Sequence, residues 1–113
     1  MSKSIETFSP LTEASFYILL SLVNPLHGYG VIKKVETMSF GRVKLAAGTL
    51  YGSISNLLRN KLIVSVGDDI SNKRRKLYQA TSLGIELIKY ELKRLSEMLD
   101  NGKNEVGDFN ENN

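Results

Sequence analysis

The last third of the chain predicts a long helix that carries apolar residues on two faces. Thr81 and Ser82 are suitable N-caps and Asn101-Gly102 is a suitable stop, so we expect a helix over 82–101. On one face the apolar residues alternate in steps of three and four, the pattern of a coiled-coil seam: Ile85, Ile88, Leu92, Leu95 and Leu99. A second apolar set lies roughly opposite: Leu83, Leu87, Tyr90 and Met98.

The two apolar faces both need to be covered, but a chain of 113 residues is the size of only one domain. Such a domain can cover one apolar face of the helix, so we expect the other face to pack on a second copy related by a two-fold axis. The alternative is a helix buried on both sides within one monomer. The tail, residues 102–113, is rich in asparagine and acidic residues, and we expect it to be disordered.

The region 47–60 predicts an amphipathic helix with an unusual outer face. Its apolar stripe is formed by Leu50, Ile54, Leu57 and Leu58. The opposite side is small and polar, and it is formed by Gly48, Thr49, Gly52, Ser55, Asn56 and Arg59. Surface helices normally mix acidic with basic residues, but this one has no acid. The absence of carboxylates indicates contact with phosphates.

Two helices are expected before this one and a β-hairpin after it. Ser9-Pro10 predicts the N-cap and first turn of the first helix, Asn24-Pro25 predicts its end, and a second helix begins near Gly28. Residues 62–66 are rich in β-branched side chains and predict a strand. A turn at Gly67-Asp68-Asp69 leads to a return strand from 75 or 76 to 80.

Four consecutive cations lie near the tip of this hairpin: Lys73, Arg74, Arg75 and Lys76. The two nearby aspartates cannot pair all four, so we expect these side chains to contact phosphates. The segment from Lys33 to Lys76 holds ten basic and three acidic residues, a charge of +7, which leaves −4 for the remainder of the +3 chain. Such asymmetry is expected of a surface that binds a polyanion, and the alternative is a solvated charged face.

The composition excludes several classes of protein. The absence of cysteine excludes thiolate metal ligands and thiol nucleophiles, His27 is the one histidine, and no carboxylate pair marks an evident pocket, so we expect no metal, no cofactor and no enzymatic activity. No run of about 18 apolar residues predicts a membrane span, and the N-terminus lacks the pattern of a signal peptide. We therefore expect a cytoplasmic protein with no membrane partner.

Together these elements predict a mainly α fold with a small β-hairpin, a winged helix-turn-helix followed by a dimerisation helix. The expected boundaries are 1–81 for the DNA-binding domain, 82–101 for the dimerisation helix and 102–113 for the tail. In this geometry the N-terminal residues of the helix over 47–60 enter the major groove of double-stranded DNA, and the hairpin reaches the neighbouring backbone or minor groove.

Individual residues on the helix over 47–60 have expected roles in DNA binding. We expect the Tyr51 ring to pack on the domain and its hydroxyl to bind a phosphate, although the ring can also be read as part of the core. Gly52 suggests close approach to DNA or, alternatively, close packing within the domain. Asn56 is suited to read adenine, and Thr49 and Ser53 to contact a base or a phosphate. His27 is read as a structural residue at a helix start, with a proton-sensing or ligating role as the alternative.

Several motifs closely resemble the PadR family of bacterial transcription regulators. They occur in the family's order over about 10–100: Leu11-Thr12, His27-Gly28-Tyr29-Gly30-Val31-Ile32, Gly48-Thr49-Leu50-Tyr51-Gly52, Leu62-Ile63 and Arg74-Arg75-Lys76-Leu77-Tyr78. The pairing of HGYG with GTLYG is more specific than either motif alone. The resemblance implies a homodimeric repressor that binds a roughly palindromic operator, and some members release DNA when a small aromatic or drug-like molecule binds.

The chain departs from the family pattern in three places. Ala46-Ala47 stands where a proline is common, the hairpin tip at 68–73 lacks the usual glycines, and there is no tryptophan. In drug-sensing members a tryptophan on the last helix stacks planar drugs, whereas Leu95 occupies that region here. We expect any small apolar or aromatic effector to bind between the last helices, near Phe16, Leu92, Leu95 and Met98. The alternative function is a winged-helix module for non-specific DNA binding or for protein-protein contact.

Overall fold

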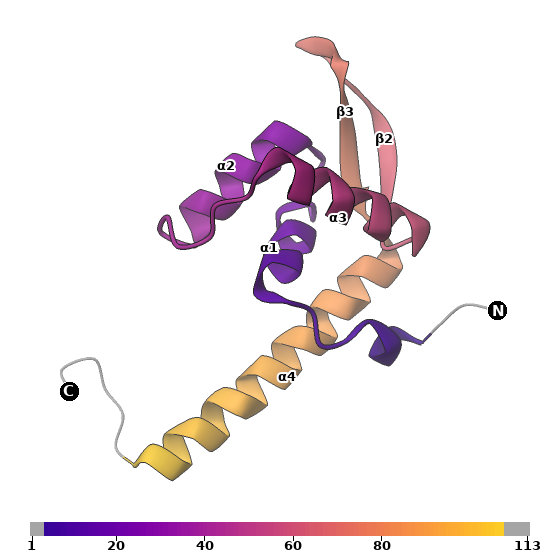
Figure 1. Cartoon of the computed structure of the whole chain (residues 1–113). Helices are drawn as coiled ribbons and strands as arrows, with labels where there is room; N and C mark the ends of the chain where they lie inside the picture. The colour runs from indigo at the N-terminus through magenta and orange to yellow at the C-terminus, as the bar shows by residue number, and fades with distance from the viewer. Residues whose placement is uncertain (1–3, 108–113) are drawn as a thin grey trace.

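The structure is a computed structural model that describes residues 4–107, with side chains described for all of these except 72–74 (Figure 1). The expected mainly α fold with a small sheet is confirmed. The elements, in chain order, are the 3₁₀ helix η1 (Ile5–Phe8), α1 (Glu13–Ser21), β1 (Leu26–His27), α2 (Gly28–Met38), α3 (Ala47–Arg59), β2 (Ile63–Asp69), β3 (Asn72–Ala80) and α4 (Ser82–Val106).

The core lies where α1, α2 and α3 meet the base of the sheet and the first half of α4. Figure 1 shows these three helices gathered into one body, from which α4 extends to one side and β2 and β3 to another. The buried apolar residues are Ile18, Leu19, Leu22, Val31, Val35, Leu50, Ile54, Leu57, Leu62, Ile63, Leu87 and Ile88. Three of the four stripe residues predicted on α3 are among them, and Leu58, at the edge of the stripe, is 36% exposed.

The first helix begins later than the sequence predicted. Its N-cap is Thr12, whose hydroxyl accepts a hydrogen bond from the Ser15 amide at 3.1 Å, so the prediction of Ser9-Pro10 as cap and first turn is wrong. The Ser9 hydroxyl instead donates to Glu91 of α4 at 2.6 Å. The helix ends at Ser21, before Asn24-Pro25. The N-terminal segment is therefore a strap that lies across α4. Helix α1 begins after Thr12, because the Thr12 hydroxyl, unlike that of Ser9, caps the first turn.

The expected hairpin is present, but its strands are longer than the sequence pattern predicted. We call β2, β3 and their turn the wing. β2 continues through the predicted turn at Gly67–Asp69, and Ile70 and Ser71 connect the two strands. The Asp69 carboxylate accepts hydrogen bonds from the Ser71 amide at 3.0 Å and the Ser71 hydroxyl at 2.8 Å, which closes this turn. Gly67, with φ of +118°, lies at a shift of register, where a bulge favours glycine.

A third strand joins the sheet beside the wing. β1 pairs antiparallel with β3, Leu26 opposite Tyr78 and His27 opposite Leu77, which gives the order β1-β3-β2. Sequence patterning did not predict β1 because two residues carry no periodicity. The pairing of β1 with β3 holds the N-terminus of α2 next to the wing.

The last helix continues past its predicted stop at Asn101-Gly102 and ends at Val106. One glycine in a helix interior costs about 1 kcal/mol, too little to end a helix whose hydrogen-bond ladder continues on both sides. The chain leaves the helix at Gly107, where φ is +90°. Residues 102–106 of the predicted disordered tail are thus helical, and 108–113 lie outside the described residues.

Candidate nucleic-acid interface

The outer face of α3 is exposed along the small polar residues that the sequence singled out. Thr49, Gly52 and Asn56 are exposed, and Ser53 is partly buried. A Cβ atom placed at Gly52 would meet no atom within 4 Å, so the missing side chain serves no packing contact in the described chain. The Asn56 side-chain oxygen accepts hydrogen bonds from Asn60 at 2.8 Å and Arg59 at 3.3 Å. The face offers hydroxyl and amide groups without a carboxylate.

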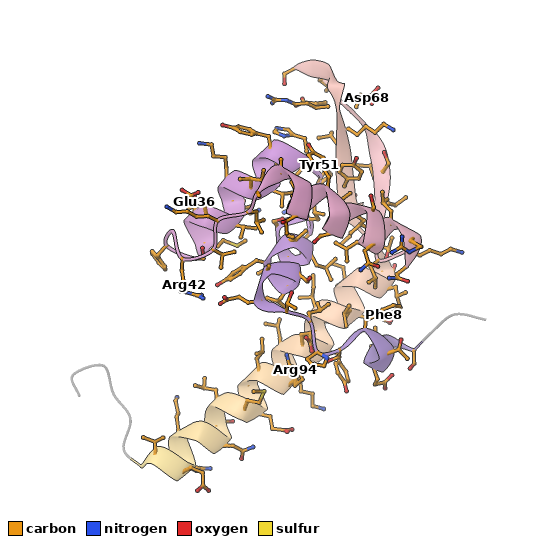
Figure 2. All side chains as sticks on the ribbon, in the orientation of Figure 1. Phe8, Glu36, Arg42, Tyr51, Asp68 and Arg94 are labelled. Carbon is orange, nitrogen blue, oxygen red and sulfur yellow. The ribbon has the colours of Figure 1, made fainter. Side chains whose placement is uncertain are left out.

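Tyr51 packs against the start of α2. A Cβ atom at Gly28 would lie 2.5 Å from the Tyr51 hydroxyl oxygen and 2.8 Å from Cζ, so the ring occupies the space that a side chain at Gly28 would need. Tyr51 nevertheless remains 49% exposed, and Figure 2 shows it on the part of α3 near the wing. This contact explains why HGYG and GTLYG occur together, because Gly28 of the first motif leaves the space that Tyr51 of the second motif fills.

His27 connects the start of α2 with the wing. Its Nδ1 accepts a hydrogen bond from the Gly30 amide at 3.0 Å and so caps α2, which agrees with the structural interpretation of this histidine. Its Nε2 lies 3.4 Å from Nη1 of Arg75 and 3.8 Å from the Asp69 carboxylate. Hydrogen bonds from Ser71 lower the pKa of the Asp69 carboxyl, with smaller contributions from His27 and Arg75, so Asp69 is ionised at neutral pH.

Tyr29 is the centre of a group of stacked and cationic side chains. Its ring stacks on the His27 ring with centroids 6.5 Å apart. The Lys33 ammonium lies 5.6 Å from the centroid of the Tyr29 ring and the Arg75 guanidinium 5.7 Å from it, within the range of cation–π attraction. Since Tyr29 is also 52% exposed, it presents this cationic group to solvent.

A cleft of about 360 Å³ lies between three parts of the structure: the start of α2, Tyr51 on α3, and β3. We call it the α2–wing cleft, and it is lined by His27, Gly28, Tyr29, Tyr51, Arg75, Lys76 and Tyr78. The sequence singled out Tyr51, Arg75 and Lys76 for DNA binding, but not Tyr29 or Tyr78. The signal available for Tyr29 was its place in the HGYG motif.

The four predicted cations of the hairpin all belong to β3. Arg75 and Lys76 are exposed, whereas the side chains of Lys73 and Arg74 lie outside the described residues. Lys76 is the register partner of Asp68 on β2. The tip of the wing is apolar at Ile70, which is 97% exposed. The described cations therefore lie between the tip of the wing and the part of β3 that pairs with β1.

The predicted dimer seam divides into two parts along α4. Ile88 is 5% exposed in the core and Ile85 packs against it, so both contact the body of their own chain. Leu92, Leu95 and Leu99 are 50%, 41% and 54% exposed. The first part of α4 packs so closely on the body of the chain that a Cβ atom at Gly84 would lie 2.2 Å from the Leu62 carbonyl oxygen.

The residues predicted to bind an effector also separate. Phe16 and Leu95 line one cavity of about 270 Å³, together with Leu11, Glu13, Tyr17, Glu91 and Arg94. Met98 instead lines a groove of about 280 Å³ with Leu99, Gly102, Lys103 and Val106. Leu92 lines neither of these. Arg94 connects the two regions, since it donates hydrogen bonds to Glu91 and, at 3.1 Å, to the Met98 sulfur.

Glu91 is a fully buried carboxylate that the sequence did not single out. It accepts hydrogen bonds from the Ser9 hydroxyl and the Leu11 amide, both at 2.6 Å, and from Arg94 Nε at 2.7 Å. Burial raises the pKa of the Glu91 carboxyl, but the hydrogen bonds from Arg94, Ser9 and Leu11 outweigh it and lower the value to about 2. Glu91 holds the N-terminal strap on α4 at the point where the helix leaves the body.

Among residues 4–107, no group of three or more metal-binding side chains is close enough to hold an ion. None of the helices described has the length and apolar character needed to cross a bilayer.

Solved structures of transcription regulators share this fold over most of their length. A transcriptional regulator from Clostridium thermocellum is 22% identical, with a TM-score of 0.65 over 87% of this chain and 91% of that chain. A PadR family regulator from Eggerthella lenta is 25% identical, with a TM-score of 0.63 over 81% and 79%. BpsR from Bordetella bronchiseptica is 22% identical, with a TM-score of 0.65 over 91% and 70%. These regulators are similar to the chain in fold.

A comparison with curated protein sequences found no match. The model of the transcriptional regulator PadR-like family matches residues 17–90, from α1 through the wing into α4. This stretch includes HGYG, GTLYG and the α2–wing cleft that joins them. The chain therefore belongs to the PadR-like family of transcriptional regulators, whose members are regulators and not enzymes.

Proposed function

We propose that the protein is a cytoplasmic repressor that binds double-stranded operator DNA as a homodimer, through α3 and the wing. The observation that carries this proposal is the outer face of α3, which is exposed, polar and free of acidic residues. A face that approaches phosphates gains nothing from carboxylates, whereas an ordinary solvated helix uses them. The family's role in transcription supports the same conclusion.

In this proposal the first turns of α3 enter the major groove. Thr49, Ser53 and Asn56 lie on successive turns and supply hydroxyl and amide groups that can read base edges. The open space beside Gly52 lets the backbone of α3 approach the DNA closely. Lys73, Arg74, Arg75 and Lys76 on β3 contact phosphates next to the groove.

The homodimer forms through the exposed half of α4. Leu92, Leu95 and Leu99 follow the spacing of a coiled-coil seam and are about half exposed in the single chain. Ile85 and Ile88 support this seam from the core side. A two-fold axis through α4 would present two α3 helices to half-sites about one helical turn of DNA apart.

A small apolar or aromatic effector is proposed to bind near Phe16 and Leu95. The cavity there combines apolar walls with the Arg94 guanidinium, and it adjoins the exposed half of α4. BpsR, which shares the fold, has its DNA binding regulated by 6-hydroxynicotinic acid. A ligand held between Phe16 and Leu95 would touch both α1 and α4, so it could change their relative position and thereby DNA binding.

Selection of bound fragments from sheared genomic DNA of the source organism tests the function. A palindromic consensus among the recovered fragments is the expected result. Near-equal affinity for every duplex would support the alternative of a non-specific DNA-binding module. Failure to bind any duplex at low salt would favour a winged-helix module for protein-protein contact.

A further inference from the structure

We propose that the α2–wing cleft binds one phosphodiester group of the DNA backbone, in addition to the contacts that α3 makes in the groove. This inference rests on the proposed function, because it deepens the description of the same interface. The site is shared by three elements: α2 contributes Tyr29, α3 contributes Tyr51, and β3 contributes Arg75 and Lys76. The structure thus assigns the HGYG motif a place at the DNA surface.

The cleft carries a surplus of positive charge. Arg75 and Lys76 line it, and Lys33 lies against the Tyr29 ring at its edge. Two carboxylates lie near these cations: Asp68 is the register partner of Lys76, and Asp69 accepts two hydrogen bonds from Ser71 in the turn of the wing and lies 3.8 Å from His27. Asp69 therefore offsets part of the charge while its Oδ1 stays engaged with the turn. An anion with several acceptor oxygens fits this environment, and a cation does not.

Two of the side chains that line the cleft, Tyr51 and Arg75, are held in place before any ligand arrives. The Tyr51 ring occupies the space above Gly28, which limits where its hydroxyl can lie. The Arg75 guanidinium lies over the Tyr29 ring and 3.4 Å from His27 Nε2, so its long side chain has little freedom left to lose. A guanidinium fixed in this way binds a phosphate with a smaller entropic cost than a freely moving lysine.

The openness of the site favours a backbone phosphate over a free phosphate ester. Tyr29 and Tyr51 are 52% and 49% exposed, so the cleft is a surface groove that would leave a small molecule largely in solvent. Tyr51 also belongs to α3, adjacent in sequence to Gly52 and two residues from Thr49. The cleft therefore adjoins the helix that carries Thr49, and a DNA backbone beside this helix can reach it.

The test uses the full-length protein and a duplex recovered by the genomic selection, with two conservative variants. Tyr51→Phe removes the hydroxyl but keeps the ring on Gly28, and Arg75→Gln removes the charge. Matched controls on α4 are Tyr90→Phe and Lys93→Gln, whose positions lie outside the cleft. Duplexes carrying a single neutral methylphosphonate at successive positions map each phosphate that the protein uses.

We expect one methylphosphonate position per half-site to weaken wild-type binding about tenfold, the size of a charge-assisted hydrogen bond. The same position should cost Tyr51→Phe and Arg75→Gln less than it costs the wild type, because each variant has already lost one of the groups that bind this phosphate. The salt dependence of Arg75→Gln should fall by about 0.9 in slope for each cleft. The two control variants should match the wild type in both measurements.

Three outcomes would overturn the site. One is full sensitivity of both variants to every methylphosphonate that weakens the wild type. Another is saturable binding of inorganic phosphate or deoxyadenosine monophosphate that Arg75→Gln abolishes, which would assign the cleft to a free phosphate ester. The third is failure of the wild-type protein to bind any duplex, which would contradict the proposed function itself and is thereby distinct from the other two.

Discussion

The helices α3 and α4 are both amphipathic, but they differ in what their own chain covers. On α3 the apolar residues Leu50, Ile54 and Leu57 are all buried, and the uncovered side is polar. On α4 the apolar pattern continues after the chain stops covering it, so that Leu92 and Leu95 are about half exposed. Figure 1 shows the same contrast, with α3 packed along its length against the body of the molecule and the second half of α4 projecting from it.

The chemistry of each uncovered side indicates a different partner. Small polar groups without acids suit a polyanion, because they allow close approach and hydrogen bonding. Leucines at coiled-coil spacing suit a second copy of the same helix. If this comparison holds, a change on the uncovered side of α3 should affect DNA binding alone. A change on the uncovered side of α4 should act through association.

The largest effect is expected from Leu95→Glu on α4. A charge in the proposed seam should separate the dimer, and the loss of two-site attachment should weaken operator binding roughly 10³-fold. Light scattering measures the mass, and fluorescence anisotropy measures DNA affinity. Glu97→Gln, on the same helix, is the control. A Leu95→Glu variant that remains dimeric would reject this face as the seam.

Ile54→Ala tests the covered side of α3. Ile54 is 2% exposed, and its truncation should lower the free energy of unfolding by about 2–4 kcal/mol. Leu58→Ala, on the same helix at 36% exposure, should cost clearly less. Urea unfolding followed by circular dichroism measures both. Equal losses for the two variants would show that the burial difference along α3 has no energetic consequence.

Glu91 stands where α4 changes from covered to uncovered, and its contribution to stability should depend on pH. Its folded-state pKa of about 2 is below the ordinary 4.5. Its stabilisation is therefore complete above about pH 4.5 and is lost as the pH falls through about 2. By linkage the effect is on the order of 3 kcal/mol.

Unfolding of the wild type and of Glu91→Gln in urea between pH 7 and pH 2.5 measures this contribution. The two curves of stability against pH should converge toward the acidic end. Glu97→Gln again serves as the control, since it removes an exposed carboxylate from the same helix. A constant gap between wild type and Glu91→Gln across this range would contradict the assignment.

The sequence predicted α3 and the order of elements well because periodic burial leaves a periodic pattern. The bounds of α3 were predicted to within one residue, since the stripe from Leu50 to Leu58 determines them. The two-residue strand β1 and the strap at Ser9 to Leu11 were missed, because their positions depend on contacts with β3 and with Glu91, far along the chain. Local patterns contain no record of such contacts.

The candidate site was predicted in part for the same reason. Tyr51, Arg75 and Lys76 were singled out by charge and by helical position. Tyr29 was missed because its role comes from stacking between His27 and Arg75, which only the pairing of β1 with β3 brings together. The seam on α4 was predicted as five equivalent positions. The fold makes them unequal, because the body of the chain covers Ile85 and Ile88 but not Leu92, Leu95 and Leu99.

Gly52→Ala is expected to have the smallest effect on stability, and of opposite sign. A Cβ atom at Gly52 meets nothing within 4 Å and α3 is a regular helix there, so alanine should raise the free energy of unfolding by about 0.5–1 kcal/mol. If α3 approaches DNA closely at this point, the added methyl group should weaken operator binding while the dimer stays intact. Ser55→Ala, also exposed on α3, is the control for helix propensity. If Gly52→Ala is more stable but binds DNA with unchanged affinity, the side of α3 that faces the groove lies elsewhere. If it is more stable but binds DNA more weakly, Gly52 is needed for DNA binding and not for the stability of the fold.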